Sequence, residues 1–268
     1  MSKRLTTLLT AAVLTAAPVA AVVAAPPASA ADCTAPKTRL HVSPRPVVVD
    51  TSGSQGFDVV LRVSANGCTV SAVDGTLTTA SRTATPLTLT NAGTAGGVTT
   101  YTARVEVTAA GLAAADAGTW RVRTVTRWAK QPSTSDDAAR KSRTGADKAV
   151  AASAKVPVLA AADLTADATS SELKQGRIKK GRVLTVKGVL TRADWRSGSY
   201  TGYAKQKVDL QFRTPKGRFK TVTGLRTRTG GAFAAAVKVS KDGCYRVVYT
   251  GSRTTAPAPS KAECIDVR

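Results

Sequence analysis

The stretch that decides the fold runs from residue 181 to residue 251. It reads GRVLTVKGVLTRADW (181–195), KQKVDLQFR (205–213), RFKTVTGL (218–225), GAFAAAVKVS (231–240) and CYRVVYTG (244–251). In the second segment Val208, Leu210 and Phe212 alternate with polar residues, a period of two that predicts a strand with one buried face. Glycine-containing turns separate the segments, and short strands at such regular spacing indicate a Greek-key β-sandwich.

The same pattern extends in both directions along the chain. Further strands are predicted at 39–42, 46–50, 56–64, 69–73, 86–90, 98–108, 121–128, 155–160, 164–169 and 264–267. No segment after the N-terminal thirty residues is long and periodic enough for a substantial helix. The chain is therefore predicted to be all-β, with two tandem immunoglobulin-like Greek-key sandwiches over residues 31–162 and 163–268.

The first half contains a corner motif and a charged insertion. Residues 112–120 are predicted to form a short helical turn with Asp116, Gly118 and Trp120 before a strand, as at the corner of immunoglobulin-like domains. Trp120 replaces the usual tyrosine, so its indole N–H has to take the place of the hydroxyl. Residues 130–153 are polar and charged, which predicts an exposed loop; an interdomain linker is the alternative.

The second half also resembles a known family. The segments KKGRVLTVKGVLTRADW (179–195), YTGY (200–203), KQKVDLQFR (205–213), a Gly-Gly turn and DGCYRVVYTG (242–251) resemble an Ig-like domain of exported proteins from high-GC Gram-positive bacteria. That family is mostly uncharacterised, so the resemblance implies a fold and export but little chemistry. The chain departs from the family by its cysteines at 244 and 264, which flank the last two strands.

The N-terminus predicts export. Lys3 and Arg4 precede an apolar run at 5–23, and Ala28-Ser29-Ala30 forms a cleavage site, so residues 1–30 are predicted to be a signal peptide. The alternative is a membrane anchor, which a proline-broken run without a basic stop-transfer flank disfavours. No later segment reaches the ~20 apolar residues that span a bilayer. The mature protein is expected to be extracellular and secreted, with retention at the cell wall as a further expectation.

Four cysteines remain after signal cleavage, and an even number in an exported chain indicates disulfides. Three connectivities are possible. Local pairing, Cys33–Cys68 and Cys244–Cys264, places one bridge in each half and is the pairing expected here.

The residues give little support for catalysis or for a metal. His41 is the only histidine, and it lies in a strand-like segment, so a Ser/His/Asp triad is not expected. The candidate calcium ligands, Asp163 with Asp167 or Asp136, Asp137 and Asp147, are set against a positive net charge. The prediction is a non-enzymatic protein with no cofactor and no metal site.

The charge is strongly positive and unevenly distributed. Lys and Arg number 39 against 17 Asp and Glu, a net charge of +22. Residues 31–162 hold 15 basic and 9 acidic residues, whereas residues 163–268 hold 22 and 8. Basic residues proposed to bind a polyanion are Lys174, Arg177, Lys179, Lys180, Arg182, Lys216, Arg218 and Lys220, extended by Arg226 and Arg228. The alternative is a solvated basic surface with no particular partner.

A second candidate site is the aromatic loop at 192–203, defined by Trp195, Arg196, Tyr200 and Tyr203. Aromatic rings stack on sugars or bases, and arginine binds phosphate or carboxylate. The alternative is that Trp195 and Tyr203 cap the end of the core.

These observations favour a secreted, non-enzymatic Ig-like module that associates with anionic envelope or extracellular polymers through its basic second domain. Wall teichoic acid, anionic lipid head groups and extracellular nucleic acid all have the required charge. The alternative function is a protein-binding or assembly module that engages another exported protein.

Overall fold

The computed structural model describes residues 33–130 and 148–268. The predicted signal peptide and most of the predicted loop at 130–153 lie outside these residues. Within them, no helix is long and apolar enough to cross a membrane.

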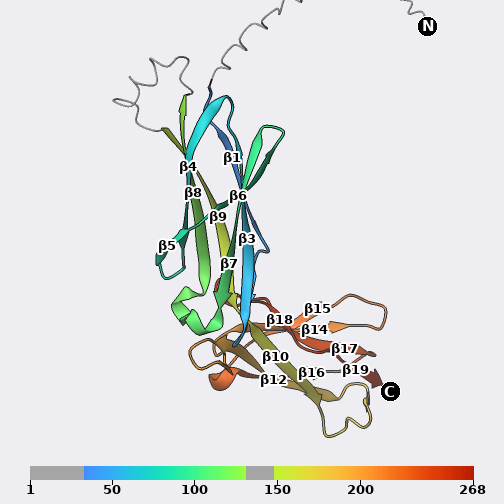
Figure 1. Cartoon of the computed structure of the whole chain (residues 1–268). Coiled ribbons are helices and arrows are strands. Elements are labelled where there is room, and N and C mark those ends of the chain that lie inside the picture. The colour runs from blue at the N-terminus through green and yellow to red at the C-terminus, as the bar shows by residue number, and fades with distance from the viewer. Residues whose placement is uncertain (1–32, 131–147) are drawn as a thin grey trace, which may run out of the picture. The chain divides into compact units, whose positions relative to one another are not determined.

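The first sandwich consists of two sheets (Figure 1). One sheet contains β1 (Lys37–Ser43), β3 (Ser54–Ser64), β7 (Val98–Thr108) and β6 (Thr90–Ala95), in that order. The other contains β2 (Val47–Val49), β9 (Lys148–Ala160), β8 (Gly118–Lys130), β4 (Cys68–Thr78) and β5 (Ala84–Leu87). Among the described strands of this sandwich, only β2 runs parallel to its neighbour, β9. This strand order, A-B-E-D facing G-F-C with added edge strands, is that of an immunoglobulin domain.

The second sandwich follows the same plan with one difference. One sheet contains β10 (Ala162–Thr169), β12 (Val183–Asp194) and β16 (Ala232–Lys238), with β13 (Ser199–Gly202) paired to the end of β12. The other contains β11 (Arg177–Ile178), β19 (Glu263–Val267), β17 (Gly243–Tyr249), β14 (Lys207–Arg213) and β15 (Lys220–Arg226), with β18 (Ala258–Pro259) beside β17. Again the first short strand, β11, runs parallel to the last. No strand corresponding to β6 is found among the described residues of this sandwich.

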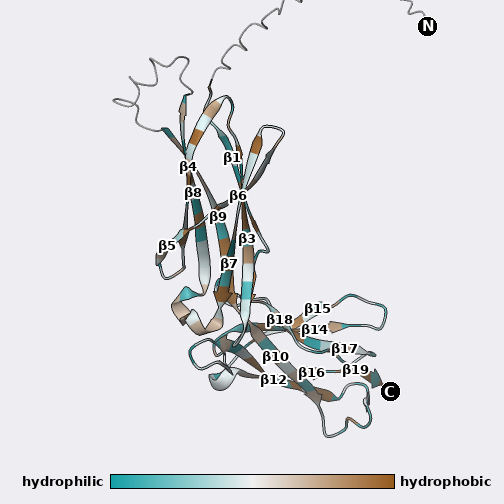
Figure 2. Ribbon diagram, viewed as in Figure 1, coloured by the Kyte–Doolittle hydropathy of each residue, from teal (hydrophilic) through white to brown (hydrophobic). Residues whose placement is uncertain are grey.

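Two hydrophobic cores hold these sheets together. In β3, alternate residues Phe57, Val59, Leu61 and Val63 are all at most 1% exposed, as a half-buried strand within the range predicted at 56–64 requires. The second core is built in the same way, with Leu184, Leu190, Leu210 and Val247 fully buried. Hydrophobic and hydrophilic residues alternate along many of these strands (Figure 2). Each such side chain contributes about 1.5–3 kcal/mol when buried, so the period of two supplies the main stabilisation.

Two of the predicted strands differ clearly from those in the structure. The single strand expected at 86–90 is the end of β5 and the start of β6. The last strand of the first half, β9, begins at Lys148 rather than at residue 155. Because β9 pairs with β8 from Trp128↔Lys148 to Gly118↔Val158, the segment between them joins two strands of one sheet. The interdomain-linker alternative is therefore wrong. The boundary at residues 162–163 remains a prediction, although the described sheets change there from β9 to β10.

The corner before β8 forms as predicted. Two short 3₁₀ turns, Ala109–Gly111 and Ala114–Asp116, precede the strand. The indole Nε1–H of Trp120 donates a hydrogen bond of 2.7 Å to the carbonyl oxygen of Asp116. The indole thus makes the upstream backbone contact that a tyrosine hydroxyl makes in other immunoglobulin-like domains.

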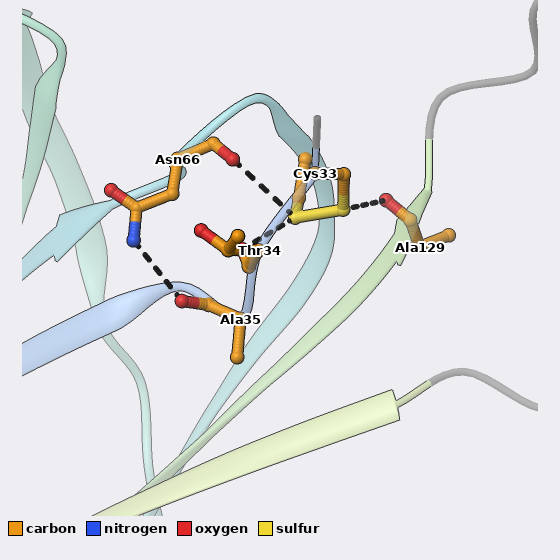
Figure 3. The surroundings of a disulfide bond; sticks show 6 residues. Cys33, Thr34, Ala35, Asn66 and Ala129 are labelled. Carbon is orange, nitrogen blue, oxygen red and sulfur yellow. Dashed lines mark hydrogen bonds between the residues drawn. A yellow bond between two sulfur atoms is a disulfide. The ribbon is translucent and has the colours of Figure 1, made fainter. Parts of the chain in front are cut away.

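Both expected disulfides are present. Cys33–Cys68 joins the segment before β1 to the first residue of β4, next to a turn in which Asn66 donates from its side-chain amide to the carbonyl of Ala35 at 3.1 Å (Figure 3). Cys244–Cys264 joins residues that face each other in the β17–β19 pair. Each bridge is local in sequence, with separations of 35 and 20 residues. Disulfides of this kind are typical of exported proteins.

Candidate polyanion-binding surface

The predicted basic residues lie mainly in loops at one end of the second sandwich. Arg213 at the end of β14 pairs with Cys244, while Gly243 pairs with Ile265 of β19. Lys180 follows β11, and its backbone N–H donates to the carbonyl of Arg268 at 2.8 Å. The loop after β11, the β14–β15 turn, the β16–β17 turn and Arg268 therefore share this end.

Seven exposed basic residues surround this end, and we call them the basic rim. They are Lys179, Lys180, Lys216, Arg218, Lys220, Lys241 and Arg268. The rim is wide, because β11 and β15 are the two ends of a row of five strands in the six-stranded sheet. Four strand spacings of about 4.8 Å separate them, roughly 19 Å. A ligand that contacts both sides has to be an extended polymer rather than a single small anion.

Three of the predicted residues belong less clearly to the rim. Arg182 forms an ion pair with Glu172, with Nε 3.0 Å from the carboxylate, so its charge is compensated. Lys174 and Arg177 close a tight turn by reciprocal backbone hydrogen bonds of 3.0 and 2.9 Å. They lie along the β11 edge, where Arg177 is paired with Asp266 in the strand register. Sequence spacing alone could not distinguish Arg182, whose charge is paired, from its neighbours.

Two further residues of the predicted set, Arg226 and Arg228, lie at the opposite end of β15 from Lys220. Arg226 donates from Nη1 to the carbonyl of Lys205 at 3.2 Å. They are therefore not part of the basic rim.

The structure adds an aromatic group beside the rim that the sequence did not single out. The guanidinium carbons of Arg246 and Arg213 lie 3.9 and 5.0 Å from the ring centre of Phe219. Arg246 also donates from Nε to the side-chain oxygen of Gln211 at 2.9 Å. The Nε of Arg213 is buried and has no hydrogen-bond partner among the described residues. These cation–π contacts orient two guanidinium groups next to Lys216, Arg218 and Lys220.

The first sandwich carries a smaller basic surface, which we call the basic ladder. Arg121 and Arg123 alternate along the outer face of β8, and Lys155 of β9 lies directly opposite Arg121. No described residue forms an ion pair with any of the three, whereas Arg127 of the same face is paired with Asp74. Like charges directly opposite each other in a sheet are destabilising. The ladder has three free charges against seven on the rim.

The aromatic loop does not form the site that the sequence suggested. Trp195 is only 6% exposed and packs in the first hydrophobic core, and its indole N–H donates to the carbonyl of Val49 at 3.3 Å. It cannot stack on a ligand, and its assignment as a binding residue is wrong. Its partner is 146 residues away in sequence, so no local pattern could indicate this contact.

The other members of the loop are divided between internal contacts and solvent. Tyr203 packs edge-to-face on Tyr249 at 6.0 Å, and Arg192 lies 5.5 Å from its ring centre. Tyr200 belongs to β13 rather than to a loop, and its hydroxyl lies beside the carboxylate of Asp50. Burial, followed by the hydrogen bond and negative charge of Asp50, raises the pKa of Tyr200 to about 12. Arg196 is exposed, and Tyr200 remains 38% exposed.

The side chains considered as catalytic or metal-binding residues do not lie close together in the part of the chain that the structure describes. His41 is exposed on β1 and is paired with Val60 across the strand register. Asp163 and Asp167 both lie on β10, four residues and therefore about 13 Å apart. Within residues 33–130 and 148–268, no three His, Cys, Asp or Glu side chains gather in a way that could hold a metal ion. The alternative calcium ligands Asp136, Asp137 and Asp147 lie outside these ranges.

Comparison with known proteins supports only a general likeness. No protein-family model matches the chain, and no curated protein sequence matches it. A DUF4785 family protein from Legionella pneumophila is 10% identical with a TM-score of 0.44, and the alignment covers 84% of this chain but 56% of that one. The D00-D0 domain of intimin is 13% identical, with 85% and 99% covered and a TM-score of 0.28. A 1.5-MDa bacterial ice-binding adhesin is 15% identical, with 88% and 66% covered and a TM-score of 0.29.

The chain thus spans little more than half of the Legionella protein. Because these TM-scores lie below 0.5, they carry no argument about function. The immunoglobulin-like class is defined by the strand pairing described above.

Proposed function

We propose that this chain is a secreted, non-enzymatic immunoglobulin-like binding protein whose second sandwich associates with anionic polymers of the cell envelope or its surroundings. The observation that carries the proposal is the basic rim. Seven exposed Lys and Arg side chains surround one end of the sandwich. The acidic residue in its turns, Asp242, accepts a hydrogen bond from the backbone N–H of Val267 at 2.7 Å.

A polymer with regularly spaced phosphates is the ligand that suits this arrangement. Each phosphate contact by Lys or Arg releases counterions, so affinity falls with salt by about 0.7–0.9 in log K per contact for each decade of salt. Four contacts to the rim therefore predict a slope near −3. Backbone-charge recognition of this kind does not depend on sequence or sugar identity, which places wall teichoic acid and extracellular nucleic acid in one ligand class.

The test compares the rim with the ladder on the mature chain. Binding to purified wall teichoic acid and to single-stranded DNA would be measured by fluorescence anisotropy between about 50 and 200 mM salt. A rim variant with Lys179→Gln, Lys216→Gln and Arg218→Gln loses three charges. The matched control, with Arg121→Gln, Arg123→Gln and Lys155→Gln, loses the same number from the first sandwich.

The rim variant is expected to bind at least tenfold more weakly with a flatter salt dependence, while the ladder variant keeps most of its affinity. The opposite order would place the site on the first sandwich. Absence of binding to both polymers at low salt would contradict the proposed function. A parallel culture experiment would follow the protein in medium and wall fractions, where release from the wall by salt is the expected result.

A further inference from the structure

The second sandwich has a vacant strand position beside β16. In the first sandwich the equivalent strand, β7, is covered by β6, with which it pairs from Thr90↔Thr102 to Ala95↔Val98. In the second sandwich β16 pairs with β12, and no other described strand pairs with it. The sheet β10-β12-β16 therefore ends at β16.

The connection from β15 to β16 is too short to fill this position. Only residues 227–231 separate the two strands, and they close a tight turn with Gly230 and Gly231 at φ values of 71° and 79°. A Cβ atom at Gly231 would lie 2.0 Å from the carbonyl oxygen of Leu190, so only glycine is accommodated there. Residues 227–231 therefore provide no strand for this edge, whereas the corresponding part of the first sandwich contains β6.

The backbone of β16 is free to pair along this edge. The N–H of Val239 donates to the carbonyl of Arg182 at 2.9 Å, so residue 239 points toward the strand that contains β12. The backbone N–H and C=O groups of successive residues point to opposite sides of a strand. Those of Ala234 and Ala236 therefore point away from β12. Exposed edges are normally protected by charged residues or proline. Here the exposed side chains before Lys238 are all alanines.

A groove of about 390 Å³ with a mixed apolar and polar lining lies between β16 and β15 next to the vacant position. Its lining includes Phe212, Val222, Val237 and Tyr245. Val222 is 50% exposed, and it lies at an irregularity of the β14–β15 pair, where Leu210 faces Thr223 and Gln211 faces Thr221. An added strand would place alternate side chains in this groove, because its residues point to opposite faces in turn.

From these observations we infer that the edge of β16 binds an extended segment of an acidic exported protein by strand addition. The segment pairs antiparallel with β16, as β6 does with β7, with apolar side chains in the groove and acidic side chains beside it. Lys238 lines the groove, and Arg226 lies at the end of β15 away from the basic rim. These charges complement an acidic segment. The net charge of +22 on the chain opposes a second copy of the same protein as the occupant.

This interaction goes beyond the polymer binding proposed above, because it uses backbone pairing at a different surface. A suitable probe is a labelled synthetic peptide of alternating valine and aspartate, with a peptide of the same composition in blocks as the pattern control. Binding to the mature chain would be measured by fluorescence anisotropy, and protection of the Ala234 and Ala236 amides by hydrogen exchange. We expect the alternating peptide to bind and to protect both amides.

The decisive variant is Ala236→Pro, which removes an N–H that does not pair with β12; proline is tolerated at such edge positions. The matched control is Ala166→Pro on β10, the opposite edge of the same sheet. The backbone N–H of Ala168 donates to the Glu263 carboxylate at 2.7 Å and therefore points away from β12. The N–H of Ala166, two residues earlier on the same strand, points in the same direction. Ala236→Pro is expected to weaken peptide binding at least tenfold, and Ala166→Pro to leave it unchanged.

A second variant keeps the inference testable if proline disturbs the fold. Val222→Asp places a negative charge in the groove at a half-exposed position and should weaken binding of the acidic peptide without a change in thermal stability. Equal binding of the block peptide, or binding that survives both variants, would overturn strand addition. Concentration-dependent dimerisation abolished by Ala236→Pro would show that a second copy is the occupant, which would overturn the acidic partner. The rim variant should leave peptide binding intact and the edge variants should leave polymer binding intact, so the two proposals can fail separately.

Discussion

Replacement of Trp120 by phenylalanine tests the physical basis of the corner before β8. Trp120 is 5% exposed, and its indole N–H is bonded to the Asp116 carbonyl at 2.7 Å. Phenylalanine keeps an aromatic ring in the core but removes the donor. A carbonyl left without its partner in a partly buried place costs about 1–3 kcal/mol, and the lower end applies here because Asp116 itself is not buried.

The matched control is Trp128→Phe on the same strand. Trp128 is 8% exposed, and its indole N–H makes no hydrogen bond to any residue within the described ranges; the amine of Lys148 lies 5.4 Å from its ring centre. Both substitutions remove the same atoms from a buried indole, and phenylalanine at 128 still offers a ring face to Lys148. The difference between their effects on the free energy of unfolding therefore reports chiefly the hydrogen bond, which we expect to be about 1 kcal/mol.

Urea unfolding followed by far-UV circular dichroism measures this difference. With m near 2 kcal/mol/M, the Trp120→Phe transition should lie about 0.5 M below that of Trp128→Phe. Trp120→Tyr should recover much of the loss, because a tyrosine hydroxyl closes this corner in related folds. Equal midpoints for the two phenylalanine variants, with no recovery by tyrosine, would refute the assignment of the corner bond.

Two further predictions concern the disulfides and Tyr200. Replacement of Cys244 and Cys264 by serine should lower the free energy of unfolding by about 3 kcal/mol, and replacement of Cys33 and Cys68 by about 4 kcal/mol, because the loop closed by Cys33–Cys68 is the longer one. Denaturant titration of each variant measures these two losses, and no loss of stability from either replacement would contradict the prediction. Tyr200 should titrate with a pKa of about 12 in absorbance measurements, and Asp50→Asn should move this pKa part of the way back toward 10 while burial keeps it raised. The Tyr200 hydroxyl loses its proton near pH 10 in the unfolded chain but keeps it in the folded chain. Its contribution to the free energy of unfolding is therefore complete below pH 10 and declines as the pH rises toward 12. A Tyr200 pKa that is unaffected by Asp50→Asn would exclude the contact between Tyr200 and Asp50.

The parts of the fold that were predictable from the sequence are those in which burial imposes a pattern. Strand β3 alternates in sequence because one of its faces is packed in the core, and Val208 and Leu210 of β14 do the same. Strands β6 and β13 leave no such signal, because every residue of both is exposed. Both strands are held by backbone hydrogen bonds, β6 to β7 and β13 to β12, and such bonds do not require hydrophobic side chains.

The candidate site was predictable in composition but not in arrangement. Charge counts located the basic half, yet the separation of Lys179 from Lys216 across the sheet depends on strand order. The ion pair between Arg182 and Glu172 depends on a loop conformation that residue spacing does not report. Trp195 was assigned to a binding loop because aromatic and arginine residues gather at 192–203, whereas its packing partners come from the first half of the chain.

The placement of the two disulfides has a mechanical consequence. In antibody domains the bridge joins the two sheets, whereas here Cys244–Cys264 joins neighbouring strands of one sheet and Cys33–Cys68 fixes the segment before β1. Cys244–Cys264 does not hold the two sheets of the second sandwich together, whereas Cys33–Cys68 ties the segment before β1 of one sheet to β4 of the other. Each bridge removes its loop from the length that can be stretched. At about 3.5 Å per residue, loops of 20 and 35 residues withhold roughly 70 and 120 Å of extension. A molecule held at both ends would therefore lengthen by nearly 200 Å more after reduction than before it, so its reach under load depends on the redox state around it.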